Sequence, residues 1–432
     1  MSRYEEKGDN SEYPLDVSKG LLQRVMPRAL SRLRTFESFG TRDFRIFWVS
    51  MIAQWMAMNM QMLARNWYMY DLTTSALLLG LTGAATGIPM VVFSPLGGAL
   101  ADRVGKRTLL IVGSFLLSLV ALTIAIVISL GLIKWWYLLI GSVCQGTISA
   151  LMIPSRQSAV PQLVGEDKVL NAVSLNAAGQ NVARLVGPAL AGFLVAPIGV
   201  DGVYYVISAC FFVAGFSMLF LPPLPSVRGA QRRPMTRDIV EGLRYVRGDV
   251  VILLLLLMAF VTVILAMPLN LLLPVFTEEV LGVGPDKLGL LMSMIGVGSL
   301  IGAVLVASLG GFRRKGLLLL VLTMFLGGAI CAFSFSRSYV LAALLMIPVG
   351  LGQVGRMVLN NALVLTNTPP AFQGRVMSLY MMAWGLQPLG TLPMGAIADA
   401  VGIAPVFAVA SSILVLFCLG VMTFTTRIRR LP

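Results

Sequence analysis

The sequence is a succession of apolar stretches, each long enough to cross a lipid bilayer. A bilayer core needs about 20 apolar residues in a helix, and short polar turns separate twelve such stretches in this chain. Hydrophobic residues make up 57% of the chain and charged residues 12%, which excludes a soluble globular domain. The expected fold is an all-α membrane protein with twelve transmembrane helices, over residues 44–70, 76–101, 108–131, 135–155, 169–197, 202–221, 250–276, 287–309, 316–335, 339–363, 375–398 and 403–425.

Positive charge is distributed unevenly between the two sides of these spans. Lys134, Lys287 and Arg337 fall on one side and three arginines fall inside spans, so the other 27 of the 33 lysines and arginines fall on the opposite side. Cytoplasmic loops carry such an excess, and we therefore expect a multi-pass cell-membrane protein with both termini in the cytoplasm. The lipid bilayer also accounts for the net charge of +14 without a nucleic-acid partner.

One change in composition divides the spans into two sets of six. Residues 222–248 carry six arginines and no long apolar stretch. Apolar residues recur there at helical spacing, which predicts an amphipathic helix on the cytoplasmic membrane surface; a disordered tether is the alternative. The expected units are a basic amphipathic N-terminal segment (1–43), a six-helix bundle (44–221), a linker (222–248), a second six-helix bundle (249–426) and a tail (427–432).

The turn between the second and third spans concentrates glycine and charge. Residues 98–108 read Gly-Ala-Leu-Ala-Asp-Arg-Val-Gly-Lys-Arg-Thr. Glycine permits sharp turns and close backbone approach, and an aspartate can cap a helix N-terminus. This turn resembles the signature loop of the major facilitator superfamily, although a turn that only fixes topology is the alternative. The resemblance implies a gating motif made of Gly98, Asp102, Arg103, Gly105, Lys106 and Arg107.

By the same resemblance, Asp102 meets the cytoplasmic start of the eleventh span when the cytoplasmic side is shut. A carboxylate at a helix N-terminus contributes on the order of 0.3–1 kcal/mol, which biases a two-state equilibrium without locking it. The corresponding loop of the second half has Gly310 in place of that aspartate. A contact between an aspartate and a helix N-terminus is therefore expected in the first half alone.

Three further strings narrow the resemblance to an exporter branch. They lie at residues 70–75, 154–172 and 241–247, and the likeness runs from about residue 38 to 425. The branch includes enterobactin-type siderophore exporters, macrolide efflux proteins and transmembrane secretion effectors. It implies two pseudo-symmetric six-helix bundles with a substrate site between them near mid-membrane, which is a known arrangement of this superfamily.

Three arginines fall inside predicted spans, where each costs roughly 2.5–3.5 kcal/mol unless it faces a cavity or a partner. Each shares a helical face with other polar residues, which predicts the walls of a central substrate cavity. The residues are Gln54, Met58, Gln61 and Arg65; Asn176, Gln180 and Arg184; and Gln353, Arg356 and Asn360, with Tyr380, Trp384 and Gln387 as a softer wall. The alternatives are snorkelling for Arg65, a bond between helices for Arg356 and core packing for the aromatic residues.

Gly187, Pro188 and Gly192 in the fifth span resemble the Gly-Pro motif of superfamily exporters. Small residues permit close helix contact and proline bends a helix. The motif is expected to bend the helix during gating, and a packing kink without a gating role is the alternative.

Several chemistries are missing from the chain. It has no histidine, its four cysteines lie singly in apolar spans, and its 19 acidic residues fall in termini, loops or span ends. We therefore expect no metal, no cofactor and no enzymatic activity.

The expected function is export of an amphipathic, neutral or anionic, siderophore- or macrolide-like molecule by a monomer that uses alternating access. Protons are the expected coupling ion, and Asp71, Asp102 and Asp399 are the remaining titratable choices.

Two alternatives to export stay open at this stage. The same fold can serve an importer or a lysolipid flippase, and a membrane scaffold that transports nothing would have the same hydropathy pattern.

Overall fold

The computed structural model describes residues 34–165, 168–223, 235–309, 312, 314–429 and 431. All regular elements within these residues are helices. The predicted basic amphipathic N-terminal segment (1–43) lies outside the described residues as far as residue 33.

The first half of the chain forms a short 3₁₀-helix and five α-helices. Gly199 interrupts the last of them with φ +73°, which divides α6 into two helices. Glycine adopts this left-handed conformation at no steric cost. The elements are η1 (Arg34–Gly40), α2 (Arg42–Thr73), α3 (Ala76–Val104), α4 (Lys106–Ser129), α5 (Trp135–Val164) and α6 (Val169–Met218).

The second half begins with α7 in the linker and continues through nine further helices. They are α7 (Met235–Gly248), α8 (Val250–Leu265), α9 (Pro268–Glu279), α10 (Pro285–Ser308), α11 (Lys315–Ser334), α12 (Tyr339–Asn367), α13 (Pro370–Gly385), α14 (Pro388–Val401), α15 (Ile403–Phe424) and α16 (Thr426–Arg429). Two predicted spans, 250–276 and 375–398, are each broken in two. Pro268 and Pro388 begin the second piece in each case, because proline lacks an N–H and fits the first helical turn.

Nine helices among the described residues are long and apolar enough to cross a membrane. This set treats α6 as a single helix and α8–α9 as a single span, and it contains neither α2 nor the α13–α14 pair. The prediction of a helical membrane protein is confirmed, whereas the number of spans is not settled by length and composition.

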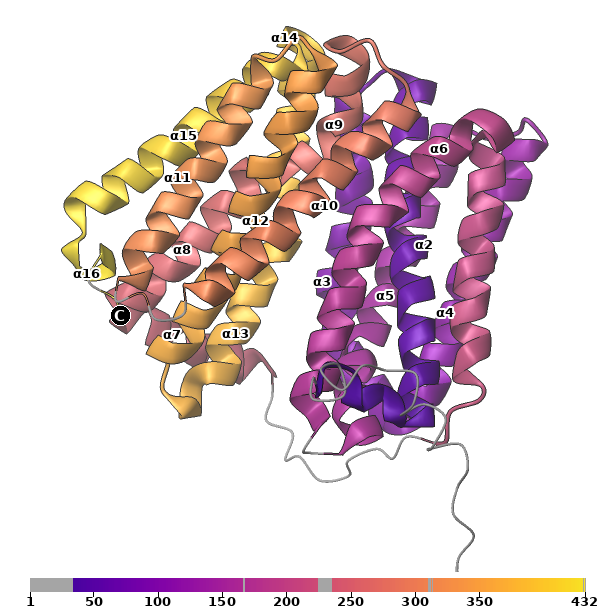
Figure 1. The fold of residues 1–432 in the computed structure, drawn as a ribbon, viewed down its shortest axis with the longest axis horizontal. Coiled ribbons are helices and arrows are strands. Elements are labelled where there is room, and N and C mark those ends of the chain that lie inside the picture. The colour runs from indigo at the N-terminus through magenta and orange to yellow at the C-terminus, as the bar shows by residue number, and fades with distance from the viewer. Residues whose placement is uncertain are drawn as a thin grey trace, which may run out of the picture.

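The helices form two bundles that converge at one end and diverge toward the other (Figure 1). The first bundle contains η1 to α6, and the second contains α8 to α16 with α7 against it. The bundles meet where α6 contacts α10 and where α3 contacts α14. We call the end where α7 and the start of α13 lie the linker end, and the end where α9 and α14 finish the opposite end.

Helices α10 and α12 of the second bundle approach so closely that backbone touches backbone. A Cβ added at Gly350 would collide with the carbonyl oxygen of Ile295, and one added at Gly302 would lie 2.5 Å from the carbonyl oxygen of Leu351. Small residues at helix interfaces allow this contact in membranes. The α10–α12 pair is therefore a rigid part of the second bundle.

Replacing Gly350 with alanine is expected to destabilise the protein by roughly 1–3 kcal/mol, since the added methyl group has no room. Gly328→Ala is the matched control, because nothing lies within 4 Å of a Cβ at that exposed position of α11. The control should be neutral, or stabilising by up to about 1 kcal/mol through its helix propensity. Unfolding of the purified protein by sodium dodecyl sulfate in mixed micelles measures both; equal stability of the two variants would contradict the packing described.

Candidate functional site

Arg65 lies inside the first bundle and joins three of its helices. Its Nη1 donates to Oγ1 of Thr86 in α3 at 3.2 Å, and to Oγ of Ser142 and Oε1 of Gln145 in α5 at 3.1 and 2.8 Å. The side chain is only 6% exposed, so it does not reach for the membrane surface. Its charge serves as a hydrogen-bonding centre between α2, α3 and α5.

The other polar residues on the same face of α2 also point into the first bundle. Gln54 and Gln61 are buried, and Met58 is half-buried. Gln54 Nε2 lies 3.9 Å from Sδ of Met152 in α5, and the Oε1 atoms of both glutamines have no hydrogen-bond partner among the described residues. Burying an amide oxygen without a hydrogen-bond partner costs free energy. Packing alone therefore does not explain the polar residues on this face.

A second buried polar face lies on α12 in the second bundle. Gln353 Nε2 contacts Sδ of Met267 at 3.1 Å, and Asn360 Nδ2 donates to the carbonyl oxygen of Leu255 in α8 at 3.2 Å. Arg356 lies between them on the face and is 2% exposed. Within the described part of the chain it has neither an ion pair nor a hydrogen bond, and its Nε is buried without a partner. Arg356 is thus a buried cation without the bonds that Arg65 makes.

The third polar face, on α6, lies where the two bundles begin to separate. Arg184 and Asn176 are half-buried and Gln180 is exposed. The next residue after Arg184, Leu185, already touches the other bundle, since its carbonyl oxygen accepts a hydrogen bond from Oγ of Ser293 in α10 at 2.6 Å. Of the three arginines inside spans, Arg184 is the one placed beside the contact between bundles.

The remaining predicted cavity residues lie in the broken span of the second bundle. Tyr380 in α13 is buried, Gln387 is half-buried at the break before α14, and the side chain of Trp384 lies outside those described. The structure therefore distributes the predicted cavity residues over the interiors of both bundles and the contact between them. It does not bring the three arginines to one point, and their role in binding substrate stays a prediction.

The predicted bend motif packs α6 against α2 of its own bundle and against α10 of the other bundle. A Cβ at Gly187 would lie 2.8 Å from Cβ of Asn59 in α2, and one at Gly192 would collide with the carbonyl oxygen of Pro285 in α10. Pro188 is buried in the same place. Both glycines are needed for the close approach of α6 to its neighbours, and a bending role remains a prediction.

The predicted gating motif lies at the linker end, in the turn from α3 to α4. Gly105 adopts φ +92° there, and Lys106 is buried. Arg107 donates to the carbonyl oxygens of Met218 and Leu219 at the end of α6, at 3.3 and 2.6 Å, which suits a cation near a helix C-terminus. The side chains of Gly98, Asp102 and Arg103 lie outside those described, so the contact predicted for Asp102 stays a prediction.

Sequence reasoning missed the polar bonds that join the bundles at the opposite end. Tyr70 in α2 donates to Oε1 of Glu279 in α9 at 2.8 Å. Asp399 at the end of α14 accepts bonds from Ser75 and Ala76 at the start of α3. The sequence did contain a signal for Asp399, since residues 395–402 repeat the pattern of residues 98–105.

At the linker end, α7 is fixed to the second bundle. Arg375 in α13 forms an ion pair with Glu241 of α7, with Nη2 and Oε2 2.9 Å apart. Tyr245 of α7 stacks on Phe372 with ring centroids 4.5 Å apart. Because both contacts join α7 to the start of α13, the linker helix is expected to move with the second bundle.

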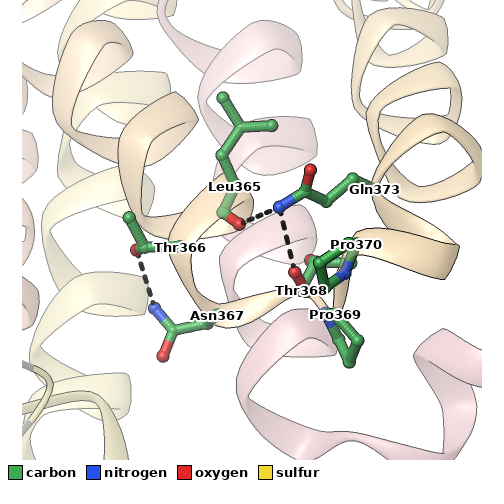
Figure 2. A pocket seen from close by; sticks show the side chains of 7 residues that line it. All are labelled: Leu365, Thr366, Asn367, Thr368, Pro369, Pro370 and Gln373. Atoms are coloured by element: carbon green, nitrogen blue, oxygen red, sulfur yellow. Dashed lines mark hydrogen bonds between the residues drawn. The ribbon is translucent and has the colours of Figure 1, made fainter.

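A wide pocket of about 710 Å³ opens beside the turn from α12 to α13 (Figure 2). Gln373 holds this turn by donating from Nε2 to the carbonyl oxygens of Leu365 and Thr368, at 3.1 and 3.2 Å. The pocket lies at the linker end and away from the polar faces of α2, α6 and α12. It is therefore not the mid-membrane site that the sequence predicts.

Two helical bundles that touch at one end, contain broken spans and hold charges in their interiors define a membrane transporter of the major facilitator type. A model of the transmembrane secretion effector family matches residues 34–431. The chain belongs to this family, as the sequence predicts.

Known proteins of this class resemble the chain over most of its length. The staphyloferrin A transporter of Staphylococcus aureus is 26% identical over 357 residues, covering 80% of this chain and 86% of that protein. Macrolide efflux protein A of Streptococcus pyogenes is 21% identical, with coverages of 88% and 94%. The crystal structure of the nucleoside transporter NupG has a TM-score of 0.74 at 13% identity, covering 89% of this chain and all of that chain, in a form with one substitution. This last likeness shows the fold alone.

The two buried arginines predict opposite responses to replacement by methionine, which has a similar length. Arg65→Met leaves the buried Oε1 of Gln145 without its donor and is expected to destabilise by roughly 1–3 kcal/mol. Arg356→Met removes a buried cation that has no partner in the described part of the structure, so it is expected to be neutral or stabilising. Detergent unfolding of the purified variants measures the difference. A loss at Arg356 as large as that at Arg65 would contradict the hydrogen bonding described.

Proposed function

We propose that the chain is a secondary active transporter that exports an amphipathic, neutral or anionic organic molecule by alternating access. The observation that carries this proposal is the contact of the two bundles at one end and their divergence at the other. Alternating access requires such one-sided closure, because rocking of one bundle against the other opens each side in turn.

Twelve spans follow when α6 is counted as two helices and α2 and the α13–α14 pair are added to the nine apolar helices. The 32 residues of α2 exceed the length that a bilayer needs. The α13–α14 pair runs from Pro370 to Val401 and is also long enough. Six spans then fall on each side of the linker, in two pseudo-symmetric bundles.

We assign the linker end to the cytoplasm. Helix α7, which carries three arginines, and the basic turn after α3 both lie at this end, and positive charge marks the cytoplasmic side. Both termini are then cytoplasmic, the opposite end faces outward, and the structure is closed to the outside. The similarity to bacterial transporters supports a location in the cell membrane.

Arg184 is the residue that best supports the substrate class. It is half-buried beside the contact between bundles and has no carboxylate partner in the described part of the chain. A guanidinium in such a place favours an anionic or hydrogen-bonding polar group. Export is the proposed direction, and its support is that one relative is named as an efflux protein. Proton coupling is proposed because a secondary transporter needs an ion gradient.

Transport can be measured with the full chain in inverted vesicles or proteoliposomes that expose the linker end. Siderophores, macrolides and lysolipids are offered with and without a pH gradient. One of the siderophores or macrolides should accumulate inside when the gradient is present. Arg184→Ala should lower its kcat/KM by about tenfold or more, since a hydrogen bond to a charged group contributes roughly 1.5–3 kcal/mol.

Arg337→Ala is the matched control, because it removes an exposed arginine from the turn between α11 and α12. It should transport at the wild-type rate. Uptake only in right-side-out vesicles would make the protein an importer, and movement of lysolipids alone would make it a flippase. The proposed function would be wrong if no compound moved and if Arg184→Ala and Arg337→Ala both behaved like wild type.

A further inference from the structure

The outer end of α14 repeats the sequence of the gating turn. Residues 98–105 read Gly-Ala-Leu-Ala-Asp-Arg-Val-Gly, and residues 395–402 read Gly-Ala-Ile-Ala-Asp-Ala-Val-Gly. Six of the eight positions are identical, and a seventh exchanges leucine for isoleucine. Asp399 takes the position of Asp102.

The two copies also form the same turn. Helix α3 ends at Val104 and is followed by Gly105 with φ +92°, whereas α14 ends at Val401 and is followed by Gly402 with φ +84°. In each case the next helix begins at the following residue. Since positive φ favours glycine, the shared string encodes a shared helix–glycine–helix turn.

The carboxylate of Asp399 caps the N-terminus of α3 from the other bundle. Its oxygens accept hydrogen bonds from Oγ of Ser75 at 2.8 Å, from the backbone N–H of Ala76 at 2.5 Å and from that of Leu77 at 3.2 Å. The first N–H groups of a helix have no partner within it, and a negative charge is favoured there. This bond set is therefore an N-cap made between bundles.

Glycine makes room for this cap. A Cβ at Gly395 would lie 2.5 Å from the carbonyl oxygen of Ala76, and one at Gly80 would lie 2.8 Å from the carbonyl oxygen of Thr391. Helices α3 and α14 thus touch backbone to backbone over about one turn. Any larger side chain at Gly395 would hold the carboxylate away from α3.

The two helices run in opposite directions. The C-terminal end of α14 lies beside the start of α3, the C-terminal end of α3 lies at the inner end where α13 begins, and each C-terminal end carries one copy of the string. Asp399 is at the outer end of α14 and meets the start of α3. Asp102 is at the inner end of α3, on the side where α13 begins.

We propose that α3 and the α13–α14 span form a reciprocal pair of caps, with Asp399 closing the outer side and Asp102 closing the inner side. This inference rests on the proposed function, because it assigns regulation to alternating access. When the helices tilt about their middle, one cap engages as the other is released. The sequence predicted an aspartate contact of this kind in the first half alone. The second half also has one, but its aspartate lies on α14, which packs against α3, and not in the loop that corresponds to the gating turn.

The test measures the two sides separately by double electron–electron resonance on the full chain in proteoliposomes, with the four native cysteines replaced. One spin-label pair occupies Leu132 and Val340, which are 61% and 65% exposed at the outer ends of different bundles. A second pair occupies the exposed Thr108 and Pro369 at the inner end. Wild type should populate a shorter and a longer distance in each pair.

Asp399→Asn should raise the ratio of outer-open to outer-closed protein by about fivefold, because it removes a negative charge and one acceptor oxygen from the N-terminus of α3, which costs on the order of 1 kcal/mol. Asp102→Asn should shift the inner pair the other way, toward inner-open protein. Gly395→Leu should open the outer side although the carboxylate remains. The control is Asp201→Asn, since Asp201 accepts its bond from Ser129 within the first bundle at 2.9 Å; it should leave both pairs unchanged.

An outer distance in Asp399→Asn that matches wild type, or an equal shift in Asp201→Asn, would overturn the reciprocal caps while leaving the proposed function intact. A single distance for both pairs in every variant would overturn alternating access itself, and the caps with it. Melting temperatures of all variants in detergent confirm that folded protein is compared in each case.

Discussion

The closed end of the molecule depends on backbone contact between helices that lack side chains where they meet. Gly192 lies against the carbonyl oxygen of Pro285, and Gly395 lies against that of Ala76. In a lipid environment the hydrophobic effect does not hold helices together, so close packing and a few hydrogen bonds must do so. The proposed alternating access requires this contact to break and re-form in each cycle. Asp399 adds charge-assisted hydrogen bonds between the end of α14 and the start of α3.

Charge inside the bundles has two different explanations. Arg65 is bonded to three side chains of its own bundle and serves the fold. Arg356 has no partner among the described residues, and Arg184 lies beside the contact between bundles. A buried cation without a partner is retained at a cost, which is the pattern expected of residues that serve transport.

Hydropathy alone predicted the helical membrane fold and the approximate ends of most spans, because each span must hide its backbone from lipid. It did not reveal that Pro268 and Pro388 break two of them, since the broken helices remain equally apolar. The hydrogen-bond partners of Arg65 could not be predicted either, because they lie on α3 and α5, which only the tertiary fold brings next to α2. Asp399 was missed because Asp102 was compared with Gly310 in the corresponding loop, whereas the functional counterpart lies on the helix that faces α3.

Alternating access requires the bundles to separate at the outer end during each transport cycle. A disulfide between cysteines at Gly83 and Leu271 tests it, since a Cβ at Gly83 would lie 2.6 Å from Cδ2 of Leu271 in the other bundle. In a background without native cysteines, oxidation should abolish transport and reduction should restore it. A matched pair at Ser118 and Ser208, whose hydroxyls are 3.0 Å apart within the first bundle, should have no effect. Full transport by the oxidised Gly83–Leu271 pair would rule out this separation of the bundles.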